Sequence, residues 1–501
     1  MKNRENEING IVFSQRAKII FSGAFLGLFL SKGLALIPGF ALDDYLHLSG
    51  VNNPPAYIGQ GRFSQAAIQL LLNNLGVSAT SIAWPSTIIF FVAAAISITL
   101  GILIATRSKG SVMSQAGIAA IIGSHPYLTE YLSYRQSIVI LGASFVLLAF
   151  VLMVILNNEK DNQKIKLLDA LIWLAIPLLV LAGTIQTTFV IGFFFIVTRF
   201  VIDSATLGGV NGIRQSFYNN SSLFIAFLFS AAIYAIVFVL MHQFSGGQND
   251  GRASLISIAD IPVRIKEIGF ILSNIFILGE PILSSTVKLL LLATIIGFTI
   301  KIGFVIPRAT IGIVILFIAL TVGSIFFVSI SSIWWPVPRA IYGIGFSFGL
   351  TLTAISIFLD KGQKPFLGII LTIALGFIFH SNAMLYDQLR TNRWDLYTAG
   401  ALAQDLVNKG VRQNQNVFLI LPDKTYPAGP NTAIGDLNIS AFSITGYTKY
   451  LMREATGRDW NIETVMGTPE ICPQNLPLWP SPESIQIFPQ QVFVCMGHPK
   501  W

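Results

Sequence analysis

The chain has 501 residues, of which 53% are hydrophobic and 11% charged, and its formal net charge is +8. Because an average soluble domain carries about 25% charged residues, this composition excludes soluble globular, disordered and fibrous proteins. Apolar runs long enough to cross a bilayer fill most of the chain, so the sequence predicts a polytopic membrane protein with a small soluble tail.

The first apolar run, 19–37, follows four basic residues that hold the N-terminus in the cytoplasm, namely Lys2, Arg4, Arg16 and Lys18. It resembles the apolar core of a signal peptide, with small residues near Ala35 and Ala41. We interpret it instead as an uncleaved first span, because many more spans follow and candidate site residues come directly after it.

Ten further apolar runs bring the prediction to about eleven spans: 84–106, 112–128, 136–156, 168–184, 186–203, 221–243, 286–305, 309–330, 341–359 and 365–382. The run at 112–128 is short for a bilayer of about 30 Å. A weaker apolar stretch at 268–283 is typical of an interfacial or re-entrant segment. Eleven spans from a cytoplasmic N-terminus place the tail outside.

The basic excess agrees with this threading. Residues 1–383 hold 23 Lys and Arg against 14 Asp and Glu, whereas residues 384–501 hold 9 against 10. Most of the basic residues then fall in inside loops, which is what the positive-inside rule predicts for a multi-pass membrane protein. The excess is no evidence for nucleic-acid binding.

The tail has the pattern of a compact α/β domain. Residues 394–409 have helical spacing, and 416–421 and 486–494 have strand patterns. The fold class is therefore mainly α, a transmembrane helical bundle with a small C-terminal α/β periplasmic domain. We expect a transmembrane catalytic domain at 1–383 and a periplasmic soluble domain at 384–501.

Cys472 and Cys495 are the only cysteines, and both fall in the outside domain, which favours a disulfide over free thiols. The sequence has no P-loop, no dinucleotide-binding fingerprint and no nucleophile elbow. No pair of its five histidines has metal-ligand spacing. We therefore expect a site without cofactor or metal, built from the outer loops.

Two adjacent carboxylates, Asp43 and Asp44, follow the first span on its outer side. Acidic residues placed against a membrane are costly and are functional candidates by default. Because neighbouring residues point apart on a helix or a strand, one of the pair faces a site, and the other caps a helix or changes the pKa of the first by like-charge repulsion. The alternative is that Asp43 only caps the following short helix.

Three arginines are candidates for binding a phosphate at the same outer level: Arg62, Arg135 and Arg339. The guanidinium fork of Arg suits a phosphate. Arg62 precedes an amphipathic stretch that suits a helix in the membrane interface, with Ile68, Leu71, Leu72 and Leu75 on one face. For Arg62, a snorkelling side chain that touches bulk phospholipid is an equally good interpretation.

Aromatic and acidic side chains in two outer loops indicate a sugar or acceptor site. Glu130, Tyr131 and Tyr134 lie in the polar segment 125–136, and Trp335 precedes Arg339 in a later loop. The apolar face of a sugar stacks on an aromatic ring, and such rings often lie beside carboxylates. The alternative is an interfacial belt of aromatic residues, which places Tyr and Trp at this depth without a ligand.

These residues resemble the serotype-converting, Gtr-type O-antigen glucosyltransferases of phages and enteric bacteria, which are GT-C-like polytopic enzymes. The similarity is carried by Asp43-Asp44 with Gly61-Arg62, by the stretch 126–137, by Pro338-Arg339 and by 382–395. Gln136 departs from the pattern, and the tail matches only in its early part. The resemblance implies acidic catalytic residues in the first outer loop and a polyprenyl-phosphate-linked glucose donor.

The residues and the resemblance together predict an inverting hexosyltransferase. Asp44 or Asp43 would act as general base on an acceptor hydroxyl of a periplasmic glycan, such as the O-antigen of lipopolysaccharide. Arginines would neutralise the leaving polyprenyl phosphate, so that no metal is needed.

Three other interpretations stay open. A flippase or exporter shares the span number and the basic bias, but it predicts charges near the bilayer midplane and broken helices in matching halves. A GT-C enzyme for another sugar has the same outer residues. A non-catalytic scaffold that presents the tail would be indifferent to the Asp pair.

Overall fold

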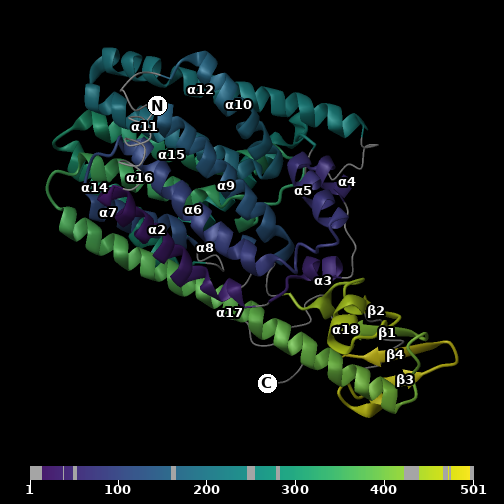
Figure 1. Cartoon of the computed structure of the whole chain (residues 1–501). Helices are drawn as coiled ribbons and strands as arrows, with labels where there is room; N and C mark the ends of the chain where they lie inside the picture. Colours follow the sequence, from purple (N-terminus) through teal and green to yellow (C-terminus); the bar gives the residue numbers. More distant parts are fainter. Residues whose placement is uncertain are drawn as a thin grey trace.

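A computed structural model describes residues 14–37, 39–48, 54–158, 165–244, 254–277, 283–421, 439–466, 472 and 476–496. Long helices run side by side in a bundle, and a small sheet domain lies beyond one end of it (Figure 1). We call this end, where the sheet domain lies, the tail end, and the opposite one the far end.

Within the described ranges, nine helices are long and apolar enough to cross a membrane. They are α2 (Gln15–Lys32, extended by the 3₁₀ turn η1, Gly33–Leu36), α6 (Ala83–Thr106), α9 (Arg135–Asn158), α10 (Leu167–Thr184), α11 (Gln186–Leu207), α12 (Gly209–Phe244), α14 (Ser285–Gly303), α15 (Pro307–Ile330) and α17 (Gln363–Asn408). The chain is a multi-pass membrane protein.

Two shorter apolar helices complete the bundle, α7 (Val112–Ser124) and α16 (Gly343–Phe358). At 1.5 Å per residue, the 13 residues of α7 reach only about 20 Å. Ten of those residues are buried, so neighbouring helices cover what the helix itself does not span. Each of the eleven apolar runs predicted from the sequence overlaps one of these eleven helices, and the run at 112–128 extends beyond the end of α7 into the short helix that follows.

Small residues let α2 and α7 pack with their backbones in close contact. A Cβ atom on Gly23 would lie 2.2 Å from the carbonyl oxygen of Ala116, and one on Gly27 would lie 2.5 Å from that of Ala120. Glycine at these positions permits the close approach that membrane helices use in place of hydrophobic driving force. The packing fixes the end of α7 beside the end of α2, where the candidate site begins.

Short helices fill the connections: α3 (Leu42–Leu48), α4 (Pro54–Gly59), α5 (Phe63–Asn74), α8 (Pro126–Leu132), α13 (Ile261–Phe276), and the 3₁₀ turns η3 (Ile258–Asp260) and η4 (Pro338–Ala340). In α5, Gln65 and Gln69 are buried while Leu71 is exposed, so the apolar face points away from the protein. That is the arrangement expected of an interfacial helix. The weak stretch at 268–283 belongs to α13 up to Phe276, and its residues 278–282 lie outside the described part.

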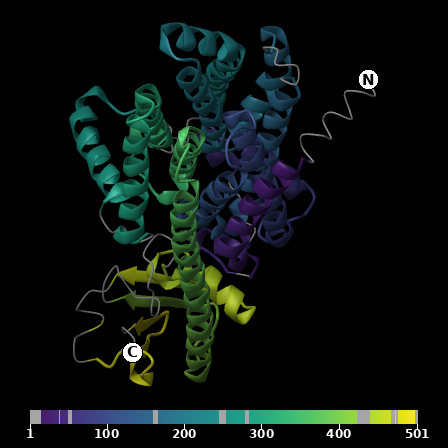
Figure 2. The same ribbon diagram turned by 90° about the vertical axis from the view of Figure 1, so that its left-hand side faces the viewer.

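The expected domain boundary at 383/384 falls inside one uninterrupted helix. α17 has 46 residues and continues from the bundle into the sheet domain (Figures 1 and 2). The sequence predicts an apolar run and a separate helix at 394–409, but residues 383–393 contain neither Gly nor Pro to break the helix between them. Ala399, Leu402 and Leu406 of α17 then form part of the core of the sheet domain.

The tail domain contains a four-stranded sheet in the order β2-β1-β4-β3. Its strands are β1 (Asn416–Leu421), β2 (Ile462–Met466), β3 (Ile485–Ile487) and β4 (Gln491–Cys495), and its other elements are α18 (Thr448–Thr456), η5 (Ala441–Ser443) and η6 (Pro482–Ser484). β1 pairs in parallel with β2 and β4, and β3 is antiparallel to β4. The strand predicted at 486–494 is two strands, since Pro489 has no N–H for a ladder and lies in the turn between them.

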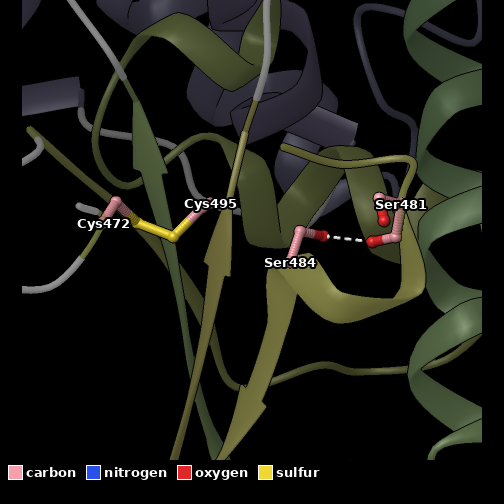
Figure 3. The surroundings of a disulfide bond; sticks show 4 residues. All are labelled: Cys472, Ser481, Ser484 and Cys495. Atoms are coloured by element: carbon pink, nitrogen blue, oxygen red, sulfur yellow. Dashed lines mark hydrogen bonds between the residues drawn. A yellow bond between two sulfur atoms is a disulfide. The ribbon is translucent and has the colours of Figure 1, made fainter. Parts of the chain in front are cut away.

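A disulfide joins Cys472 to Cys495 at the end of β4, with a Cα–Cα distance of 5.8 Å (Figure 3). Ser484, in the turn that precedes β3, donates a hydrogen bond to the carbonyl oxygen of Ser481 at 2.7 Å in the same region. The disulfide therefore anchors Cys472 to β4, a central strand of the sheet.

Candidate active site

The residues predicted from the outer loops come together at the tail end of the bundle. α3 carries the two aspartates, Arg62 immediately precedes α5, and Glu130 lies on α8. Arg339 lies in η4, just before α16. Segments that are up to about 300 residues apart in the sequence thus meet in one region.

Asp44 has a structural role at the start of α9. Its side chain is fully buried, and its Oδ2 accepts hydrogen bonds from the backbone N–H of Ala41 at 2.8 Å and of Arg135 at 3.0 Å. Its Oδ1 accepts one from the N–H of Gln136 at 2.9 Å. Burial raises the pKa of Asp44 from 3.8 to about 7, although the three N–H donors favour the carboxylate. Both oxygens are already engaged, which leaves little capacity for a substrate proton.

Arg135 is also engaged with the protein. Its guanidinium donates to the carbonyl oxygen of Gly39 at 2.8 Å and to that of Ala35 at 3.3 Å, and it also bonds the carbonyl oxygen of Ile37. The predicted phosphate ligand is therefore occupied by three carbonyls. Together with Asp44, it holds the first outer loop against the start of α9.

Glu130 and Arg339 form an ion pair walled by aromatic rings. The Nη1 of Arg339 lies 2.7 Å from Oε1 of Glu130, and the backbone N–H of Arg339 donates to Oε2 at 2.5 Å. The guanidinium lies 4.3 Å from the ring centroid of Tyr134 and 4.6 Å from that of Trp335. Four residues predicted for two different roles are thus one cluster, in which the cation of Arg339 already has an anionic partner.

The buried state of the tyrosines argues against an aromatic belt at this depth. Tyr131 and Tyr134 are 7% and 8% exposed, whereas belt residues face the lipid headgroups. The ring of Tyr131 packs edge-on against that of Tyr342 at 6.0 Å. These rings line the interior of the tail end.

Asp43 differs from its neighbour in being half-buried. Its Oδ1 accepts a hydrogen bond from the hydroxyl of Tyr447 at 3.1 Å, and no other hydrogen bond to its side chain occurs within the described residues. One carboxylate oxygen is therefore left for a ligand. Of the two aspartates, Asp43 has the geometry that a general base requires.

Arg62 is the predicted arginine whose donors have no partner among the residues that the structure describes. Its side chain is partly exposed, and across the described ranges it has neither a hydrogen bond nor an ion pair. Burial raises the pKa of Tyr131, and the cation of Arg62 opposes this rise. Within the described part of the chain the donors of this guanidinium are available to an anionic ligand.

Tyr57 contributes a partly buried hydroxyl to this region, and it was not predicted from the sequence. Burial raises the pKa of Tyr57 to about 12, the cation of Arg62 opposes the rise, and the charge of Asp43 adds to it. The same hydroxyl is 3.4 Å from Oε1 of Gln136. The only signal in the sequence was a Tyr five residues before Arg62.

No three His, Cys, Asp or Glu side chains gather in a metal-binding arrangement among the residues that the structure describes. The expectation of a metal-free site stays a prediction. The pair Asp43 and Arg62 can perform proton abstraction and anion binding with their own side chains.

No protein-family model and no curated protein matches the sequence. Among solved structures, the chain is similar to an oligosaccharyltransferase from Archaeoglobus fulgidus, crystallised with Zn and sulfate, with 12% sequence identity and a TM-score of 0.35. The alignment covers 85% of this chain and 61% of the archaeal one, so the chain spans less than two thirds of that protein's length. A similarity of this size does not establish an activity, and the assignment below depends on the residues of this chain.

Proposed function

We propose that the protein is an inverting, GT-C-like membrane glycosyltransferase. It transfers a sugar, glucose by the resemblance in its motifs, from a polyprenyl-phosphate donor to a periplasmic glycan such as the O-antigen of lipopolysaccharide. The observation that carries the proposal is a half-buried carboxylate, Asp43, which accepts a hydrogen bond from Tyr447 and has no other hydrogen bond to its side chain within the described residues. Arg62, which precedes α5 at the same end of the bundle, has neither a hydrogen bond nor an ion pair among those residues.

The reaction needs one base and one cation at this place. The carboxylate of Asp43 takes the proton of the acceptor hydroxyl, whose oxygen attacks the anomeric carbon of the donor sugar. The bond from that carbon to the phosphate oxygen breaks in the same displacement, which inverts the anomeric centre. The polyprenyl phosphate leaves as an anion, and Arg62 stabilises its charge.

The cluster of Glu130, Arg339, Tyr134 and Trp335 suits the wall of a sugar site. The guanidinium of the ion pair contacts both aromatic rings. We assign the wall to the donor sugar or the acceptor, with Tyr131 at its inner side. In this assignment Arg339, paired with Glu130, forms part of the wall, and Arg62 is the arginine that binds the phosphate.

The membrane orientation is part of the proposal. The far end carries Arg16 and Arg107, and the sequence assigns both to the cytoplasm by the positive-inside rule. The tail end, with the site and residues 384–501, then faces the periplasm across the bacterial inner membrane. A lipid-linked donor reaches the site laterally, and a glycan acceptor reaches it from the aqueous side.

The experiment uses the purified full-length protein with a radiolabelled polyprenyl-phosphate glucose and a lipopolysaccharide or lipid-linked O-antigen acceptor. We expect label in the glycan, with transfer reduced about 10²–10⁴-fold in Asp43→Asn, because general-base catalysis contributes about this factor. Asp405→Asn, on α17 beyond the bundle, is the matched control and should transfer label at the wild-type rate.

Two outcomes would contradict the proposal. Movement of the labelled lipid between the leaflets of proteoliposomes, without transfer, would identify a flippase. Transfer by the wild type with undiminished transfer in Asp43→Asn would keep the enzyme and remove Asp43 as its base.

A further inference from the structure

A tyrosine of the soluble domain makes direct contact with the candidate base. The hydroxyl of Tyr447 donates a hydrogen bond to Oδ1 of Asp43 at 3.1 Å, between residues 404 positions apart in the sequence. Burial and the charge of Asp43 raise the pKa of Tyr447 to about 12, so the hydroxyl keeps its proton at neutral pH and remains the donor.

The position of Tyr447 is fixed by the sheet. Thr445 donates from Oγ1 to the carbonyl oxygen of Thr464 on β2 at 2.9 Å, and the hydroxyls of Thr448 and Thr464 lie 2.5 Å apart. Gly446, with φ +90°, makes the turn between these anchors in a conformation that residues with a Cβ rarely adopt. Tyr447 is therefore held on both sides, directly at the start of α18.

The segment before this turn is tied to α17. Asp395 accepts a hydrogen bond from the hydroxyl of Ser440 at 2.5 Å and one from the backbone N–H of Ala441 at 3.0 Å. Asp395 is itself buried. Asp395 of α17 thus anchors the segment that leads to the turn at Gly446. Because α17 continues into the bundle, this anchor links the orientation of Tyr447 to the membrane helices.

The position of the other partner, Asp43, is also fixed by contacts of its neighbours in the sequence. Asp44 next to it is bonded to the start of α9. On the opposite side of the loop, Asn392 of α17 bonds both the N–H and the carbonyl of Phe40, and Tyr45 packs in the core of the tail domain. The hydrogen bond between Tyr447 and Asp43 therefore joins two segments that the rest of the fold holds in place.

We propose that Tyr447 is the positioning residue for the general base, and that the soluble domain is thereby an integral part of the active site. The inference rests on the proposed function. By holding Oδ1 of Asp43, Tyr447 orients the carboxylate and leaves Oδ2 for the acceptor hydroxyl. The soluble domain then contributes to the chemical step, whether or not it also binds the acceptor.

The test compares Tyr447→Phe with the wild type in the radiolabel transfer assay. Phe keeps the ring packing and removes only the donor. We expect kcat to fall about tenfold or more, which is the lower end of the effect of a hydrogen bond to a charged group, with the KM for the donor unchanged. Tyr450→Phe on the same helix, whose hydroxyl has no bond to Asp43, is the control and should keep the wild-type kcat.

A second comparison separates positioning from a general structural effect. In an Asp43→Asn background, Tyr447→Phe should cause little further loss of the residual rate, because the group it positions is gone. An equal loss in both backgrounds, or an unchanged kcat in the single variant, would overturn the role of Tyr447 while wild-type transfer leaves the proposed function standing. Absence of transfer in the wild type would instead remove the proposed function.

Discussion

The two ends of the bundle use their charged residues differently. At the far end, Arg107 binds Asp203 through three hydrogen bonds of 3.0, 3.1 and 2.7 Å, which tie α6 to α11. Arg16 donates to the carbonyls of Lys109 and Gly110 and so ties α2 to the connection before α7. Both cations have partners in the protein and no reason to bind a ligand.

The tail end contains saturated charges of the same kind and, beside them, two that are not saturated. Both carboxylate oxygens of Asp44 and the Nε and Nη2 of Arg135 are hydrogen-bonded to backbone groups, and Glu130 is paired with Arg339. Asp43 keeps one oxygen without a partner and Arg62 keeps its donors, within the described part of the chain. Candidate residues at a membrane surface are therefore best ranked by the hydrogen-bond donors and acceptors that the protein itself does not use. Their depth relative to the membrane does not distinguish them.

The largest effect on stability is expected from separating Glu130 and Arg339. The carboxylate of Glu130 is 1% exposed and the side chain of Arg339 is 15% exposed, so Glu130→Gln removes the negative charge that faces a largely buried cation. The cost should be about 3–5 kcal/mol of unfolding free energy, measured by thermal unfolding in detergent micelles. The double variant Glu130→Gln/Arg339→Gln should recover part of it. A single variant as stable as the wild type would contradict the buried pair.

Asp44 should give the protein a stability that depends on pH. Its pKa is raised from 3.8 to about 7 in the folded state, so its contribution is complete below about pH 4 and is lost as the pH rises through about 7. One pKa unit corresponds to 1.36 kcal/mol, which puts the change on the order of 4 kcal/mol at most.

The measurement for Asp44 is the stability of the wild type relative to Asp44→Asn between pH 5 and pH 8. We expect this difference to shift against the wild type as the pH rises, because the asparagine does not titrate. A difference that stays constant over the range would show that the folded carboxyl titrates elsewhere.

The smallest of these effects compares one arginine from each end. Arg62→Gln should weaken donor binding about 10- to 100-fold, since hydrogen bonds to charged groups contribute about 1.5–3 kcal/mol. Arg107→Gln at the far end should leave donor binding unchanged and cost at most about 1 kcal/mol of stability, because its ion pair is partly exposed. The measurement is the KM for the labelled polyprenyl-phosphate sugar. Equal effects of the two substitutions would remove the distinction between the ends.

Local patterns in the sequence predicted the helical spans well. The run at 84–106 corresponds to α6 (Ala83–Thr106) and the run at 309–330 to α15 (Pro307–Ile330). Apolar length alone decides such elements, because the backbone of a membrane span must bond within its own helix. For α17, the sequence pattern indicated an apolar span and a separate helix at 394–409, whereas the structure has one continuous helix.

The site was predicted only as a set of candidates. Each residue type was recognisable from the sequence, but the roles within the set depended on contacts between distant segments. Asp43 and Asp44 are neighbours of identical chemistry, and no local rule tells which of them meets the N–H groups of α9. Tyr447 lies in a stretch with no recognisable motif, so the sequence offered no signal for its bond to Asp43.

The sequence by itself determined the class of the molecule, since its apolar periodicity and charge bias follow from the bilayer and act locally along the chain. It also determined which residue types were available at the tail end. The tertiary structure decided their use. A charged side chain is available to a ligand only if folding does not bring a protein donor or acceptor within hydrogen-bond distance of it. For Asp44, Arg135 and Arg339, such partners come from segments about 90 to 210 residues away.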